Sequence, residues 1–146
     1  MRRVRLLSTV AIAFTFTMGL SAVPMVVSVA SASAQVTCSA TVLASAVGGG
    51  QVRIPIQATG VNNFNCILGN GNAGNPVSTL QNALNRCNLH AGLTVDGIYG
   101  ANTAQAVRNV ESHFQIGVDG VYGPQTGTRM SWPVNGNPSV CRKFQV

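Results

Sequence analysis

The chain has 146 residues, which is enough for one domain preceded by a processed leader and argues against two full catalytic domains. Nine Lys and Arg residues against three Asp and Glu residues give a formal charge of +6, but Arg2, Arg3 and Arg5 supply half of it. Beyond residue 34 six basic and three acidic residues remain, a charge of +3 with no basic run to follow a phosphate backbone, so we expect no nucleic-acid partner.

The N-terminal segment has the three parts of a secretory signal peptide. Arginines precede an apolar stretch from Leu6 to Val29, and the small residues Ala32-Ser33-Ala34 follow it. This pattern predicts a signal peptide over residues 1–34, and a secreted protein that is extracellular or wall-associated and not stably inserted in a membrane after cleavage. The alternative is an uncleaved anchor, because the stretch is long enough to span a bilayer; its five Ser and Thr residues before Val23 count against that.

The cysteines indicate an oxidising compartment. All four lie beyond the predicted cleavage site, and an even number in a short exported chain predicts two disulfides, with all three pairings open: Cys38, Cys66, Cys87 and Cys141. The alternative, a nucleophilic Cys87 assisted by His90, needs a free thiolate, which is unexpected outside the cell.

The region after the leader is expected to be β-rich. Residues 37–46 and 51–58 are rich in β-branched and small residues, and the glycines between them predict a β-hairpin. Pro55 would make the second strand an edge strand, because proline cannot donate to a ladder. Residues 60–74 are rich in Asn and Gly and are predicted to be loop, so we assign residues 35–65 to a β-rich N-terminal extension.

Three short helices are expected to follow. The first spans about 76–87 with Asn75 as its cap, the second about 101–116, and the third starts at Pro124 and stops before Pro133. Their apolar stripes would bury one another in a small core. The predicted fold class is therefore mainly α, a small three-helix bundle over residues 66–146 with a short N-terminal β-hairpin.

An internal repeat is the most informative feature. Residues 95–103 return as residues 118–126 with the shared pattern V-D-G-x-Y-G-x-x-T, each copy just before a predicted helix. The aspartates can accept backbone N–H groups in an Asx-type turn, the next glycines permit positive φ, and the tyrosines can fill the core. We therefore assign a loop-shaping role to Asp96, Gly97, Asp119 and Gly120.

These residues resemble the peptidoglycan-binding type 1 domain, a three-helix module of secreted bacterial wall proteins. Leu80-Gln81 with Leu84-Asn85 is similar to the family's L-Q-x-x-L-N element, Leu93 to Thr103 to its L-x-V-D-G-x-[FY]-G-x-x-T loop, and Gly117 to Met130 to its closing segment. Ala106-Val107 and Phe114-Gln115 resemble the A-V…F-Q of its second helix. The resemblance covers residues 68–132 and implies noncovalent attachment to peptidoglycan, with wall hydrolases as further candidate partners.

Candidate contacts are the aromatic, amide and basic side chains that suit a polymer of amino sugars and acidic peptides. They are Tyr99, Asn102, Tyr122, Arg129 and Trp132. For the two tyrosines the competing interpretation is that their rings are buried in the core and only the hydroxyl lies near the surface.

The chain has too few acidic and basic side chains to favour catalysis. A glycosidase would need Asp96 and Asp119 about 5–9 Å apart across a cleft, and a zinc site normally needs three protein ligands, whereas His90 and His113 are isolated. We therefore expect no cofactor, no metal and no enzyme activity, and predict a secreted peptidoglycan-binding protein. The alternatives are a secreted interaction or inhibitor protein acting on another wall protein through residues 35–65, and, less favoured, a small peptidoglycan hydrolase.

Overall fold

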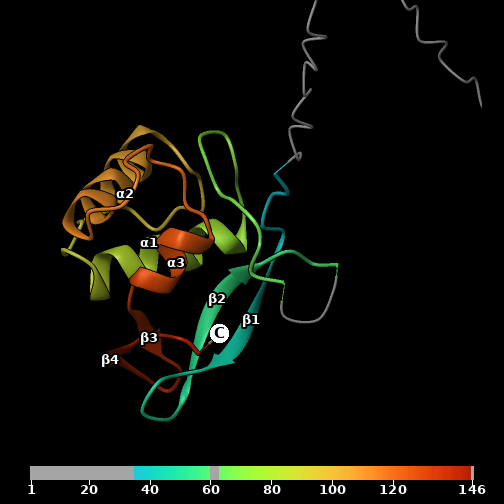
Figure 1. Cartoon of the computed structure of the whole chain (residues 1–146), viewed down its shortest axis with the longest axis vertical. Coiled ribbons are helices and arrows are strands. Elements are labelled where there is room, and N and C mark those ends of the chain that lie inside the picture. The colour runs from blue at the N-terminus through green and yellow to red at the C-terminus, as the bar shows by residue number, and fades with distance from the viewer. Residues whose placement is uncertain (1–34, 60–62, 146) are drawn as a thin grey trace, which may run out of the picture. The chain divides into compact units, whose positions relative to one another are not determined.

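A computed structural model describes residues 35–59 and 63–145 of the chain (Figure 1). The predicted signal peptide therefore lies outside the described residues. In chain order the elements are β1 (Ala40–Ser45), β2 (Gln51–Ile56), α1 (Asn75–Cys87), α2 (Ala101–His113), α3 (Pro124–Arg129), β3 (Trp132–Val134) and β4 (Asn137–Arg142).

The predicted fold class, a mainly α three-helix bundle, is wrong. Across the described residues, three short helices are combined with a four-stranded antiparallel sheet in the order β1-β2-β3-β4. Helix α1 contacts all four strands and has fewer contacts with α2, and Figure 1 shows it between α2 and the strands. The sheet therefore covers more of α1 than α2 does.

The predicted hairpin is confirmed, but its second strand is not at an edge. β1 and β2 pair from Ala40 opposite Ile56 to Ser45 opposite Gln51, whereas β3 pairs with the other side of β2 at Val52 alone. Because β3 does not extend along β2 as far as Pro55, the missing N–H of this proline removes no bond to β3. Proline is thus accommodated in an interior strand whose outer partner is short.

The helices lie where they were predicted, with different ends. Asn75 is not the cap of α1: Gly74 takes the N-cap position with a φ of 110°, and its N–H donates to the carbonyl of Gly97 at 2.8 Å. Helix α2 ends at His113, before the predicted residue 116, because Gln115 adopts a φ of 54°. Within the described chain, no helix has the length and apolarity that a bilayer crossing requires.

The core lies between α1, the inner face of the sheet and the repeat loops. Its largest fully buried side chains include Trp132, Tyr99, Ile54, Leu68, Leu80, Leu84 and Met130. This core spans elements from both ends of the described chain, since Ile54 belongs to β2 and Trp132 to β3. The sheet is therefore part of the same core as the helices.

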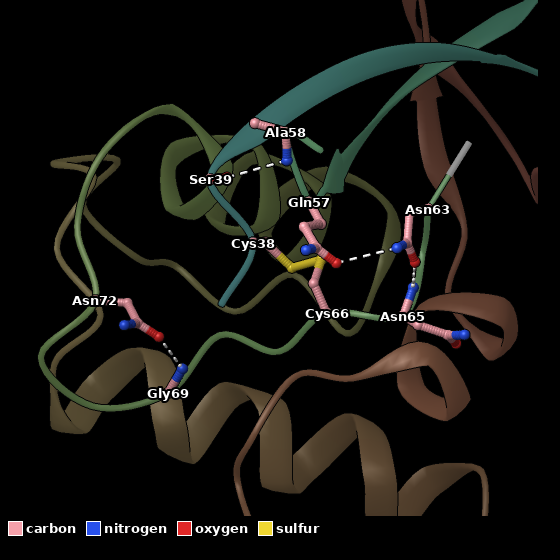
Figure 2. Close-up of a disulfide and its surroundings, with 9 residues drawn as sticks. All are labelled: Cys38, Ser39, Gln57, Ala58, Asn63, Asn65, Cys66, Gly69 and Asn72. Atoms are coloured by element: carbon pink, nitrogen blue, oxygen red, sulfur yellow. Dashed lines mark hydrogen bonds between the residues drawn. A yellow bond between two sulfur atoms is a disulfide. The ribbon is translucent and has the colours of Figure 1, made fainter. Parts of the chain in front are cut away.

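The predicted two disulfides are confirmed, and the structure selects one of the three pairings. Cys38 pairs with Cys66, beside the segment that enters β1 (Figure 2), and Cys87 at the end of α1 pairs with Cys141 in β4. The first bond joins segments 28 residues apart and the second joins segments 54 apart. The second bond therefore fastens the C-terminal hairpin to α1.

Candidate functional site

The two repeat loops have the same backbone geometry. Asp96 Oδ1 accepts the N–H of Ile98 at 2.9 Å, and Asp119 Oδ1 accepts the N–H of Val121 at 2.7 Å. The glycine after each aspartate has a positive φ, 74° at Gly97 and 76° at Gly120, a region that favours glycine. Both aspartates are therefore placed as turn formers, each bonded to the loop that carries it.

A buried amide on α1 holds the first loop. The Gln81 side chain is 1% exposed; its Oε1 accepts the N–H of Gly97 at 2.9 Å, and its Nε2 lies 2.9 Å from Asp96 Oδ1 and 3.2 Å from Thr103 Oγ1. The bond from Gln81, followed by that from the Ile98 N–H, lowers the pKa of Asp96. Gln81 thus joins the turn to the start of α2.

A buried carboxyl group on α2 holds the second loop. Glu111 is 1% exposed, and its Oε2 accepts the N–H groups of Asp119 at 3.1 Å and Gly120 at 2.9 Å, while Oε1 accepts the hydroxyl of Thr126 at 3.3 Å. Burial raises the pKa of Glu111 and the negative charge of Asp119 adds to the rise, which the backbone N–H groups partly oppose. Glu111 therefore plays the same positioning part for α3 that Gln81 plays for α2.

The aromatic candidates lie in the core. Tyr99 and Trp132 have no exposed surface and Tyr122 is 4% exposed. The Tyr99 hydroxyl donates to the carbonyl of Gly120 at 2.9 Å, which joins the first loop to the second, and burial raises its pKa. Trp132 packs edge-on against Tyr122 and donates through Nε1 to the carbonyl of Gly127 at 3.2 Å. None of the three rings has a face that a ligand could reach, which favours the interpretation that they fill the core.

The other two candidates are exposed, and only one lines a groove. Arg129 lies in the last turn of α3. Asn102 lies in the first turn of α2, where two pockets of about 240 and 330 Å³ share Leu93, Thr94 and Asn102 as lining residues. We call this continuous depression the α2 groove; its further polar lining comes from Gln81, Asp96, Thr103, Gln105 and Asn109.

Amide side chains dominate the chemistry of the α2 groove. Asn102, Gln105 and Asn109 follow one face of α2, and Gln105 Nε2 donates to Asn109 Oδ1 at 3.0 Å. Asp96 is the only ionisable side chain among the lining residues. Such a surface can offer both donors and acceptors to hydroxyl and acetamido groups.

Gln105 and Asn109 were not predicted as groove residues, and Gln81 and Glu111 were not predicted as loop anchors. A signal for the first pair was present, because amides at positions 102, 105 and 109 recur with the helical period. The anchors gave a weaker signal, since Gln81 and Glu111 carry polar side chains in helices and only the tertiary fold buries them.

The described residues contain no group of three or more His, Cys, Asp and Glu side chains that could hold a metal ion. His90 and His113 are both exposed, and all four cysteines are in disulfides.

Comparisons with known proteins bear on the helical part of the chain. Residues 73–130 match the sequence model of the family described as "Putative peptidoglycan binding domain". No curated protein matches the chain.

Solved structures similar to this chain include the SleB N-terminal domain, at 35% identity over 42% of this chain and 84% of that one, with a TM-score of 0.40. A fused zinc-dependent amidase, peptidase and peptidoglycan-binding domain-containing protein from Clostridium acetobutylicum ATCC 824 matches at 31% identity over 41% of this chain, with a TM-score of 0.38. A peptidoglycan-binding protein from Clostridioides difficile, in complex with glutamine hydroxamate, matches at 26% identity over 51% of this chain, with a TM-score of 0.40. The matched regions span 26% and 42% of the last two chains.

Proposed function

We propose that the protein adsorbs to peptidoglycan through the α2 groove and makes or breaks no covalent bond, in keeping with the match of residues 73–130 to the model of a peptidoglycan-binding domain. The observation that carries the proposal is the row of amides at Asn102, Gln105 and Asn109, which lies inside the matched segment and lines the groove.

The amides of the groove suit the sugar strands of peptidoglycan. Amide groups donate and accept hydrogen bonds, as acetamido and hydroxyl groups do, so each can be matched without burying a charge. The groove is polar and open to solvent, and binding must therefore offset the desolvation of groups that water already satisfies. We expect modest affinity for a single site, raised by rebinding along the polymer.

We also propose where the protein acts and which part of the chain performs each role. Residues 1–34 would act as the signal peptide that exports the protein, so that residues 66–146 meet the wall outside the membrane. The repeat loops would keep the groove in shape, because Asp96 and Gln81 line it and bond to each other. Separate wall hydrolases are the partners we propose for the protein.

A sedimentation assay on insoluble peptidoglycan sacculi tests this function. Oxidised protein beginning at Gln35 is incubated with sacculi, and both the bound protein and any soluble fragments released are measured. We expect retention without release. Absence of retention would refute the proposal and favour a protein partner, whereas released fragments would refute the noncatalytic part of it.

Variants locate the site on the surface. Replacing Asn102 and Asn109 together by Ala should reduce retention at least about fivefold, because each loses a hydrogen-bonding group at an exposed position without disturbing the core. Asn70→Ala is the matched control, since Asn70 is also exposed but lies in the turn before α1. Equal losses in both variants, or an unchanged double variant, would place the site elsewhere.

A further inference from the structure

A second pocket lies outside the α2 groove, between α1 and the β3–β4 hairpin. It has a volume of about 320 Å³, at the small end of the range for ligand sites. One wall is the α1 face with Asn82 and Arg86, the opposite wall is the hairpin with Pro133 and Asn135, and Arg53 of β2 completes the lining. The family match supplies only the α1 wall, so the pocket exists because the sheet packs on the helix.

Two guanidinium groups line this pocket and no carboxylate does. The sequence has three acidic residues, Asp96, Glu111 and Asp119, and the structure places all three at the repeat loops. Arg53 Nη1 donates to Thr41 Oγ1 on the neighbouring strand at 3.3 Å, which orients the side chain while its other N–H groups keep their capacity to donate. The pocket is therefore positively charged with no acidic side chain in its lining.

A covalent bond fixes the two walls relative to each other. Arg86 is followed by Cys87, which is bonded to Cys141 of β4, and Cys141 lies opposite Pro133 in the β3–β4 pairing. The helix wall and the hairpin wall are thus joined next to the pocket. Such a site needs little reorganisation when a ligand enters, which favours binding.

We propose that this pocket binds a carboxylate of a short acidic peptide. A guanidinium presents parallel N–H donors that match the two oxygens of a carboxylate. The amides of Asn82 and Asn135 can meet the peptide group, and the ring of Pro133 can pack on an aliphatic side chain. Inorganic phosphate would use the arginines and leave the amide and proline surfaces without contacts, so the composition of the lining favours a peptide.

The proposal goes beyond peptidoglycan retention and does not depend on it, because the two sites have different lining residues. Titration of the oxidised protein with the soluble dipeptide alanyl-glutamate, followed by NMR chemical shifts, tests it. We expect saturable shifts at residues of the pocket, and at least about tenfold weaker binding of the dipeptide diamide, which keeps the peptide group and lacks both carboxylates.

Variants separate the pocket from general attraction by a basic protein. Arg53→Ala combined with Arg86→Ala should weaken dipeptide binding at least about tenfold. Replacing both arginines by lysine should weaken it less, because lysine keeps the positive charge but lacks the paired N–H donors of the guanidinium. Arg108→Ala is the matched control, since Arg108 is exposed on α2 and does not line the pocket; its binding should stay within about twofold of wild type.

Three results would overturn the proposal. They are an equal loss of binding in the Arg108 control, binding of the diamide as tight as that of the dipeptide, and equally tight binding of inorganic phosphate to the same residues. Melting temperatures of the arginine variants, which change exposed side chains, should match wild type. Dipeptide binding should persist in the Asn102 and Asn109 double variant, because neither residue lines this pocket, so failure of the groove proposal is distinguishable from failure of this one.

Discussion

The two repeat loops share a sequence pattern but are held by different chemical groups. The first is anchored by the neutral amide of Gln81 on α1, and the second by the carboxyl group of Glu111 on α2. Each anchor accepts the N–H of the loop glycine and reaches the threonine at the start of the next helix. The repeated motif therefore encodes the turn, while the preceding helix supplies the group that fixes the turn in place.

The difference in anchors gives the loops opposite responses to pH. The pKa of Asp96 in the first loop is lowered on folding, so its contribution to stability is present above its unfolded pKa and is lost as the pH falls. The pKa of Glu111 is raised, so the folded state binds its proton more tightly than the unfolded chain does. The free energy of unfolding therefore decreases as the pH rises through the window between the unfolded and folded pKa of Glu111.

The largest effects are expected from removing the core ring of each loop. Tyr99→Ala and Tyr122→Ala should each lower the free energy of unfolding by about 4 kcal/mol, because both rings are buried. Urea unfolding followed by circular dichroism measures the loss. If Tyr99→Ala kept its stability and lost only sacculus retention, the ring would be a ligand contact and the core interpretation would fail.

Removing the anchors should have the next largest effect. Glu111→Ala leaves two backbone N–H groups and a hydroxyl without their acceptor and should cost about 3 kcal/mol, against about 2 kcal/mol for Gln81→Ala. Amide hydrogen exchange should accelerate at Gly120 in the first variant and at Gly97 in the second. The exposed Gln105→Ala is the control and should cost less than about 0.5 kcal/mol; uniform acceleration in either anchor variant would contradict local anchoring.

The tyrosine hydroxyls should differ by a smaller amount. Tyr99→Phe removes the donor to the Gly120 carbonyl and should cost about 1 kcal/mol. Burial raises the pKa of Tyr122 with no hydrogen bond of the described residues contributing to the shift, so Tyr122→Phe should leave the urea midpoint nearly unchanged. Equal losses in the two variants would show that the link between the loops does not depend on this hydroxyl.

The smallest effect at neutral pH is expected from giving the second loop the anchor of the first. In Glu111→Gln the amide oxygen can accept both backbone N–H groups and the amide nitrogen can donate to Thr126, so stability should stay within about 1 kcal/mol of wild type. The difference should appear in melting temperatures measured across pH 4 to 7. Wild type should lose stability above the unfolded glutamate pKa of about 4.3, and the variant should lack that component; parallel curves would contradict the raised pKa of Glu111.

The sequence predicted the features that depend on local pattern. The hairpin around Gly48-Gly49-Gly50, the three helices and the repeat turns follow from alternation, helical period and turn residues. β3 and β4 were missed because their sequences, WPV and NPSVCR, each contain a proline. β4 also has five exposed residues in six, so it gives no alternating apolar signal.

The candidate site was predicted only in part, because burial is a tertiary property. Asn102 was predicted as a contact and lines the α2 groove, whereas its helical neighbours Gln105 and Asn109 line the same groove and were not predicted, although the period was visible. The aromatic candidates were chosen for chemistry that suits sugars, and the fold uses those rings to fill the core. Arg53 and Arg86 could not be paired from sequence, since the β2 and α1 residues meet only after the sheet packs on the helix.

The pairing of Val52 with Val134 has a kinetic consequence. More than half of the chain separates these residues. The hairpin of β1 and β2 can therefore form early, whereas β3 can pair with β2 only after the long segment between them has become ordered. The Cys87–Cys141 bond also spans distant segments. Refolding from the oxidised denatured state should therefore be faster than refolding from the reduced state, because the crosslink shortens the search that brings the two ends of the sheet together.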